Sequence, residues 1–278
     1  MTKDAIIAGG GPAGAACAIW LRQLGADVLL IEAQDRLGGL QRRSPYENLW
    51  IPGVRGRTGQ EVAEALDAHV AALDIPVLRG CPVTQVAADG RRVTTPRGDF
   101  AARFLVIATG SKPRGGGFTA AANVAIGPGV AMEALDVADK PVAILGGGDN
   151  AFDQARFVRD RGGRPTLFSR RAPRAQKRLQ ALIPDVPVVI GPYAADPAAM
   201  TVNEQPFAAF GVMYGFEAVI PPGLTPELDN GYVRVDRHGE TSLPGVFACG
   251  EVTDDWHPCV TTSAAHGIQV AKAISRRL

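Results

Sequence analysis

Two glycine-rich loops carry the residue types best suited to holding a phosphate group. The first reads Gly9-Gly10-Gly11-Pro12-Ala13-Gly14 and the second Gly146-Gly147-Gly148-Asp149-Asn150-Ala151, each between an apolar segment and a helical pattern. A pyrophosphate reaches the free N–H groups at a helix start only where glycine lets it approach closely. Two such loops therefore predict two dinucleotide sites. The expected contacts are Gly9, Gly11, Pro12, Ala13 and Gly14 at the first site, and Gly146, Gly148, Asp149, Asn150 and Ala151 at the second.

The first loop is part of a complete strand–loop–helix–strand pattern. We expect a buried strand at residues 5–8, a helix at 15–24 and a second strand at 28–31 that leads into Glu32. An acidic side chain about 20 residues beyond the glycines is the expected ligand of a ribose 2′-hydroxyl. The alternative is an ordinary strand–turn–helix unit that binds no ligand.

The second loop has a different chemistry at the end of the following strand. The loop lies between an expected strand at 142–145 and an expected helix at about 151–161, and the next strand leads into Arg170 and Arg171, with Arg174 close behind. A carboxylate there would repel a 2′-phosphate, whereas guanidinium groups bind one bidentately. The sequence therefore favours NADPH over NADH. The alternative is that the three arginines form a solvated basic face.

Composition is typical of a globular enzyme of two domains. The 278 residues carry a formal net charge of +1, so neither nucleic acid nor an anionic membrane is expected as the main partner. We expect no membrane span, and the apolar N-terminal segment contains a glycine turn that argues against a secretory signal. The cysteines show neither CxxC nor zinc-ligand spacing, which predicts a cytoplasmic location. They are Cys17, Cys81, Cys249 and Cys259.

Two segments rich in glycine or proline predict how the chain divides. Residues 111–117 have the composition of a flexible linker, and a second boundary is expected near residues 221–223. The second glycine loop lies between them, so the second domain is expected to be inserted into the first. We predict an α/β fold of two Rossmann-like dinucleotide-binding domains, one formed by residues 1–113 and 224–278 and the other by residues 114–223.

Several segments occur in an order shared with a known family. They are Gly9–Gly14 with Glu32, Gly38-Gly39, Glu47-Asn48 with Pro52-Gly53, Ala108-Thr109-Gly110, Gly146–Ala151, Ser169-Arg170-Arg171, and Gly245–Glu251 with the helix beyond it. On these segments, which span nearly the whole chain, the sequence resembles the low-molecular-weight thioredoxin reductases, flavoproteins with two dinucleotide-binding domains. The resemblance implies FAD at the first loop, NADPH at the second and commonly a homodimer.

The resemblance also implies further contacts to the cofactors. Gly250-Glu251 stands where the family usually has Gly-Asp beside the ribityl–phosphate part of the flavin, and glutamate offers the same carboxylate one methylene further out. Ser169 replaces a usual histidine ahead of the two arginines. Besides the loops, Glu32 and the arginines, the implied cofactor-binding residues are Gly39, Gln41, Asn48, Thr109, Gly110, Gly250, Glu251 and Pro258.

The chain departs from the family where the family carries its redox dithiol. Thioredoxin reductases have a CxxC motif just ahead of the second glycine loop, but residues 129–141 contain no cysteine. A dithiol relay at that place is excluded, and with it the usual route to reduction of thioredoxin.

A second departure follows Glu251. By spacing, Pro258-Cys259 takes the place of an Arg-Gln pair that packs against the flavin in the family. Cys259 is a candidate redox thiol, activated near the flavin or a helix N-terminus, and His257 is a candidate proton donor or acceptor. The alternatives are a packed, inert Cys259 and a lid over the flavin ring formed by Trp256 and His257.

Three hypotheses of function follow. The first is an FAD-dependent NAD(P)H oxidoreductase that takes electrons from NADPH and passes them through FAD directly to a small molecule or a redox protein. The second is a small-dithiol oxidase or disulfide reductase that uses Cys259 or a dithiol of the substrate. The third is a flavin-binding redox sensor without turnover, and the intact second loop with its arginines counts against it.

Overall fold

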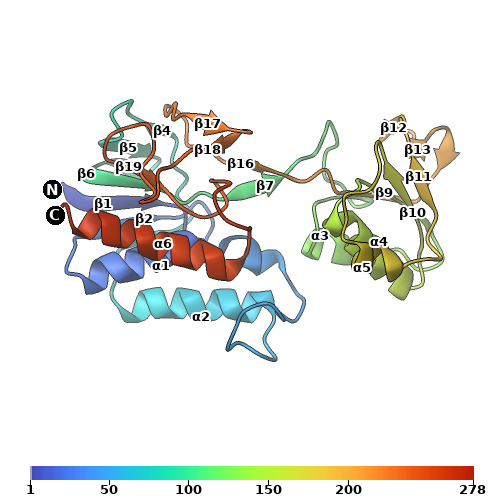
Figure 1. Ribbon diagram of the computed structural model, residues 1–278, viewed down its shortest axis with the longest axis horizontal. Coiled ribbons are helices and arrows are strands. Elements are labelled where there is room, and N and C mark those ends of the chain that lie inside the picture. Colours follow the sequence, from blue (N-terminus) through green and yellow to red (C-terminus); the bar gives the residue numbers. More distant parts are fainter. Residues whose placement is uncertain (1) are drawn as a thin grey trace. The chain divides into compact units, whose positions relative to one another are not determined.

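The chain folds into two compact units in a computed structural model that describes residues 2–278. Unit 1 comprises Met1–Lys112 and Glu217–Leu278, and unit 2 comprises Pro113–Phe216. Both units are α/β, and unit 2 is inserted between the two parts of unit 1, as the chain colours show (Figure 1). The predicted fold class is confirmed.

Unit 1 is built on a seven-stranded sheet. The strand order is β3-β2-β1-β6-β5-β4, and β19 also pairs with β6. Strands β3, β2, β1, β6 and β19 run parallel, whereas β4 and β5 pair antiparallel. The bounds are β1 Lys3–Ala8, β2 Val28–Ile31, β3 Val77–Leu78, β4 Gln85–Val86, β5 Arg92–Thr95, β6 Gly98–Ile107 and β19 Val246–Ala248.

Side chains of the central strands alternate between two apolar layers. Ala5 and Ile7 pack with the helices on one face, and Ile6 and Leu29 pack on the other face under β4, β5 and the segment that follows unit 2. Helices α1 and α6 lie side by side on the first face (Figure 1). The helices are α1 Pro12–Gln23, α2 Gly59–Ala72 and α6 Val260–Ser275, with the 3₁₀ helix η1 Gly39–Arg43 and a small hairpin of β17 Leu228–Asp229 and β18 Tyr232–Val233.

The segments between the units are more ordered than their composition predicts. The first part of segment 111–117 is strand β7 (Ser111–Pro113), which pairs with β16 (Phe216–Ala218). Residues 221–223 form a turn packed within unit 1, where the carbonyl of Pro222 accepts a hydrogen bond from an N–H of β4 at 2.8 Å. The second junction therefore lies earlier than the expected one, because backbone pairing orders a segment that by composition resembles a linker.

Unit 2 is built on a five-stranded parallel sheet in the order β11-β10-β9-β15-β8. One face packs against α3, α4 and α5, and the other carries an aromatic cluster that includes Phe168, Phe207 and Phe210. The bounds are β8 Val124–Ile126, α3 Val130–Glu133, β9 Pro141–Leu145, α4 Asp149–Asp160, β10 Arg164–Ser169, α5 Lys177–Ala181, β11 Val188–Ile190, β12 Ala195–Asp196, β13 Thr201–Val202, β14 Gln205–Pro206 and β15 Ala209–Val212. Strands β12, β13 and β14 form a separate antiparallel sheet.

Both helices that follow a glycine loop begin earlier than the sequence predicts. Helix α1 begins at Pro12 and not at residue 15, and α4 begins at Asp149 and not at residue 151. Proline suits the first helical position because its N–H would be unpaired there anyway. An acidic side chain is likewise favourable in the first turn of a helix. Each helix therefore starts inside its loop.

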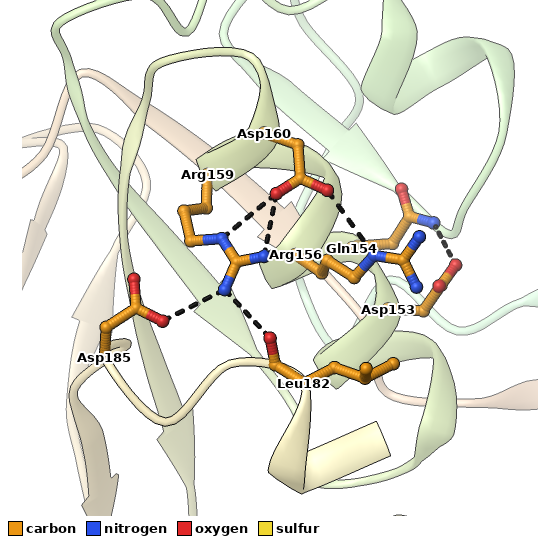
Figure 2. A network of polar contacts seen from close by, with 7 residues as sticks. All are labelled: Asp153, Gln154, Arg156, Arg159, Asp160, Leu182 and Asp185. Atoms are coloured by element: carbon orange, nitrogen blue, oxygen red, sulfur yellow. Dashed lines mark hydrogen bonds and ion pairs between the residues drawn. The ribbon is translucent and has the colours of Figure 1, made fainter. Parts of the chain in front are cut away.

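A polar network joins the last turn of α4 to the chain after α5. Figure 2 shows Arg159 between Asp160 and Asp185, with its guanidinium also donating to the carbonyl oxygen of Leu182 at 2.9 Å. The ion-pair distances from Arg159 are 2.8 Å to Asp160 and 3.0 Å to Asp185. The carboxylates are at least half exposed, so this network contributes little to stability. No helix within residues 2–278 is long and apolar enough to span a membrane.

Candidate functional site

The first loop connects β1 to α1. A Cβ atom on Gly14 would overlap the carbonyl oxygen of Gly9, so only glycine lets α1 pack this closely on the loop. Gly11 is the N-cap, and no side chain caps the helix. A Cβ atom on Gly11 would meet only the Cα atom of Gly39, at 3.9 Å. The free N–H groups of the first turn and the open space beside Gly11 fit a pyrophosphate.

Glu32 follows β2 directly and reaches back to this loop. Its Oε2 accepts a hydrogen bond from the N–H of Gly10 at 2.6 Å, and its Oε1 accepts one from the N–H of Gln34 at 2.8 Å. The side chain is held at the carboxyl end of the parallel sheet, and the residue is 8% exposed. A carboxylate has about four acceptor positions. Glu32 therefore keeps capacity to accept a ribose hydroxyl, as the fit to FAD requires.

Helix η1, which contains Gly39 and Gln41, begins against the same loop, and Asn48 follows the helix. The N–H of Gly38 donates to the carbonyl of Gly10 at 2.9 Å, which fixes the start of η1 against the loop. The side chains of Asn48 and Gln41 are hydrogen-bonded at 2.9 Å. Gly39 itself lies against the loop, since a Cβ atom on it would be 3.1 Å from the Cα atom of Gly11.

A carboxylate that the sequence analysis did not single out anchors η1. Asp67 on α2 accepts two hydrogen bonds from Arg79, at 2.6 and 3.0 Å, and one from Arg42 of η1 at 3.3 Å. Partial burial acts to raise the pKa of Asp67, but hydrogen bonds and charge from Arg79, with help from Leu37 and Arg42, hold it below the usual value. No local motif marks this residue, because its partners come from two distant segments, residues 37–42 and Arg79.

Four further residues expected at the flavin, Thr109, Gly110, Gly250 and Glu251, follow β6 and β19. The hydroxyl of Thr109, next to Gly110, donates to the carbonyl of Val219. The Ser111 hydroxyl donates to Glu251 at 2.9 Å, which orients the carboxylate implied to contact FAD. Gly250 adjoins α1, since a Cβ atom there would lie 2.7 Å from the Cβ of Ala13.

His266 supports this turn, although the sequence analysis did not predict it. Its Nδ1 accepts a hydrogen bond from the N–H of Gly250 at 3.3 Å, and the residue is buried on α6. Burial lowers the pKa of His266 below the usual value, and the charge of Asp255 only partly opposes this. A neutral imidazole therefore accepts the Gly250 hydrogen bond near neutral pH.

The segment that contains His257 and Cys259 lies beside Gly250 and Glu251. His257 and Pro258 are exposed and line a hollow of about 10 Å³ together with Glu251. Cys259 is the N-cap of α6, with its Sγ 3.4 Å from the N of Thr262. Burial acts to raise the pKa of this thiol, but hydrogen bonding to Thr262 and Thr261 outweighs it, and the pKa lies below the usual value. The charge of Glu251 acts in the opposite direction to these hydrogen bonds, and the activation of Cys259 stays a prediction.

The second site is a cavity of about 840 Å³ in unit 2. This volume is typical of small-molecule sites. Gly148 is the N-cap of α4 without a side-chain cap, and a Cβ atom there would meet nothing within 4 Å, so the helix start is open to a phosphate. The lining includes the expected residues Gly146, Gly148, Asp149, Asn150, Arg170, Arg171 and Arg174, and also Tyr193, Met213 and Tyr214.

The loop that carries the arginines is held at the backbone. The N–H of Arg174 donates to the carbonyl of Gly147 at 2.8 Å, and Asp149 accepts hydrogen bonds from Gln176 at 2.8 and 3.0 Å. Ser169 donates its hydroxyl to the carbonyl of Arg171 at 2.7 Å. The guanidinium groups therefore project from a fixed loop beside the start of α4, which fits the charge of NADPH.

Tyr193 and Tyr214 on the cavity wall were not predicted from the sequence. Tyr193 follows β11 and Tyr214 follows β15. Ligands of open α/β sheets bind beyond the carboxyl ends of the strands, so this position was the signal available in the sequence.

Two open glycine loops, one beside a carboxylate and one beside arginines, define an α/β protein with two dinucleotide sites. The model of the pyridine nucleotide-disulphide oxidoreductase family matches residues 3–183, and the chain belongs to this family. A ferredoxin–NADP reductase of Limosilactobacillus fermentum is 32% identical over 89% of this chain and 85% of its own length. A thioredoxin reductase of Escherichia coli O157:H7 is 26% identical over 98% of this chain and 95% of its own.

A solved structure supports the same fold. Thioredoxin reductase of Lactococcus lactis matches with a TM-score of 0.83 and 22% identity, covering 100% of both chains. The protein is accordingly a thioredoxin reductase-like FAD-dependent NAD(P)H oxidoreductase, with FAD and NADPH as its cofactors.

Proposed function

We propose that this oxidoreductase passes electrons from NADPH through FAD directly to an acceptor outside the chain, without a protein dithiol in between. The observation that carries the proposal is the placement of the thiols. Cys17, Cys81 and Cys249 are buried, and burial raises the pKa of Cys17 and brings that of Cys249 to about 12. Cys259 alone is partly exposed among the cysteines within residues 2–278. A dithiol relay needs two reactive thiols within bonding reach of each other.

The residues of unit 1 would bind FAD and those of unit 2 would bind NADPH. In each unit the helix start offers N–H groups to a pyrophosphate, while Glu32 accepts from a ribose and the arginines neutralise a 2′-phosphate. When bound, FAD supplies the electron chemistry, and the chain supplies position and electrostatics. His257 is the proposed proton carrier, because it is exposed beside Glu251.

The proposed acceptor is a redox protein or a small molecule. A relative that matches most of the chain is named a ferredoxin–NADP reductase, which supports a redox-protein acceptor. A homodimer and a cytoplasmic location stay predictions from the sequence. Light scattering after size-exclusion chromatography would test the dimer.

Cys259 supports a second candidate function, the reduction of a small disulfide or oxidation of a small dithiol. Its partial exposure and lowered pKa favour a thiolate at the start of α6. A single cysteine would need a dithiol or disulfide of the substrate to complete the exchange.

Anaerobic stopped-flow mixing of the FAD-loaded protein with NADPH, and separately with NADH, tests the first proposal. We expect the visible flavin absorbance to bleach faster with NADPH, and Cys259→Ala to bleach and to reduce ferricyanide as the wild type does. No bleaching with either nucleotide would overturn the proposal. If Cys259→Ala bleaches normally but loses turnover of a small disulfide, the second candidate replaces the first.

A further inference from the structure

Two tyrosines and one arginine form a stacked cluster on the wall of the nucleotide cavity. The Cζ atom of Arg170 lies 5.3 Å from the ring centroid of Tyr193 and 5.7 Å from that of Tyr214. The hydroxyl of Tyr193 donates to that of Tyr214 at 3.0 Å. All three side chains line the cavity. The guanidinium thus rests on two aromatic rings that are joined at their hydroxyls.

The packing behind the rings fixes the pair. The ring centroid of Tyr193 lies 5.6 Å from that of Phe168, and the ring centroid of Tyr214 lies 6.3 Å from that of Phe118. A Cβ atom on Gly116 would overlap the Tyr214 ring, so the glycine-rich segment packs directly against it. The two tyrosines follow strands at different places in the sheet, and their hydrogen bond spans the edge where a nucleotide is expected.

The two neighbouring arginines are held differently. Arg171 is restrained through its carbonyl oxygen and Arg174 through its N–H, and the side chains of both are exposed. These restraints act on the backbone and leave the guanidinium groups free to rotate. Arg170 has its guanidinium itself in contact with protein.

We propose that Tyr193 and Tyr214 are positioning residues that orient Arg170 as the main reader of the 2′-phosphate, so that the preference for NADPH over NADH depends on this tyrosine pair. A guanidinium that contacts rings with its face keeps its N–H edge available for bidentate donation to a phosphate. A side chain already ordered before binding also loses less conformational entropy when it binds.

Tyr193 keeps the proton that it donates to Tyr214. Burial and the hydrogen bond to Tyr214 raise the pKa of Tyr193, and the nearby charge of Arg170 opposes this only partly. The phenol therefore keeps its proton at physiological pH and continues to donate to Tyr214.

Isothermal titration of the FAD-loaded protein with 2′,5′-ADP and with 5′-AMP tests the inference, because the two probes differ only in the 2′-phosphate. In Tyr193→Leu we expect the affinity for 2′,5′-ADP to fall about fivefold, as for the loss of one cation–π contact of about 1 kcal/mol. The affinity for 5′-AMP should change by less than about twofold. Tyr193→Phe keeps the aromatic face and should retain most of the preference, which separates orientation of Arg170 from a general loss of packing.

Double-variant cycles identify the residue through which the tyrosine acts. In an Arg170→Ala background, Tyr193→Leu should produce no further loss of 2′,5′-ADP affinity, whereas in an Arg171→Ala background the fivefold loss should persist. Thermal unfolding of each variant shows whether the fold is retained.

Two results would overturn the proposed role of the tyrosines but not the assignment of the cavity to NADPH. Equal losses for both probes in Tyr193→Leu would mean that the tyrosines contact the shared adenosine, and an unchanged affinity for 2′,5′-ADP would mean that Arg170 needs no such support. Failure of the wild-type protein to bind 2′,5′-ADP would overturn the assignment of the cavity to NADPH as well. The proposal about the acceptor would stand in each of these cases, because flavin turnover decides it separately.

Discussion

The two glycine loops share one backbone arrangement and differ in what the next strand presents to it. In unit 1, Gly10 faces the carboxylate of Glu32, which accepts its N–H at 2.6 Å. In unit 2, the corresponding Gly147 faces Ser169, whose hydroxyl donates to the carbonyl of Arg171 at 2.7 Å. The comparison teaches that the loops suit the pyrophosphate common to both cofactors, while the position after the second strand is suited to telling the nucleotides apart.

The largest difference is expected at the third glycine position of each loop. A Cβ atom on Gly14 would overlap the carbonyl oxygen of Gly9, whereas unit 2 already has a buried Ala151 there. We expect Gly14→Ala to lower the free energy of unfolding by about 2 kcal/mol or more, because overpacking forces the loop away from α1. Urea unfolding would measure this, and the FAD content after gel filtration should fall to near zero.

The matched change in unit 2 is Ala151→Gly, which removes a methyl group instead of adding one. We expect a loss of about 1 kcal/mol from helix propensity alone, with FAD content unchanged. Equal losses in the two variants would contradict the difference in loop packing.

The strand-end side chains should give the next largest effects. Glu32→Gln places an amide N–H₂ against one of the two backbone N–H groups that the carboxylate now accepts. We expect a loss of about 1–3 kcal/mol in unfolding free energy, together with weaker FAD binding measured by fluorescence titration. Ser169→Ala removes one neutral hydrogen bond and should lose about 1 kcal/mol, with weaker NADPH binding and unchanged FAD binding. The comparison would fail if Glu32→Gln weakened the binding of NADPH but not of FAD, or if Ser169→Ala weakened the binding of FAD but not of NADPH.

A part-buried ion pair in unit 1 should show a pH dependence. The guanidinium groups of Arg79 and Arg42 hold the pKa of Asp67 below its usual value. Its stabilising contribution is therefore present above the unfolded pKa of about 3.9 and lost as the pH falls through the lower folded pKa. Asp67→Asn should lower the unfolding free energy by about 1–3 kcal/mol at neutral pH and by less in acid. A loss that stays constant from neutral pH to acid would argue against the ion pair as its cause.

The exposed ion pair of unit 2 should show the smallest effect. Asp185 contacts Arg159 at 3.0 Å, but its side chain is 61% exposed, and Arg159 also binds Asp160 (Figure 2). Asp185→Asn should change the free energy of unfolding by less than about 0.5 kcal/mol, as urea titration would show. A larger change would mean that the segment after α5 depends on this contact more than its exposure implies.

The sequence was most informative where neighbouring residues decide the structure. The expected strand at residues 5–8 lies within β1, and Glu32 follows β2 as predicted. The helices begin earlier than the sequence predicts, because Pro12 and Asp149 are common loop residues that also suit the first turn of a helix. Composition predicts linkers at 111–117 and 221–223, but it does not reveal the backbone hydrogen bonds that order Ser111–Pro113 and Pro222.

The glycine spacing, the strand-end acid and the arginines determined by themselves that this protein has two dinucleotide sites of different charge, since those features act over a few residues. The cluster of Arg170, Tyr193 and Tyr214 was decided by the tertiary structure. So was the support of Gly250 by His266. Strand order in a sheet sets which distant residues meet at its edge, and long-range packing, not local spacing, sets that order.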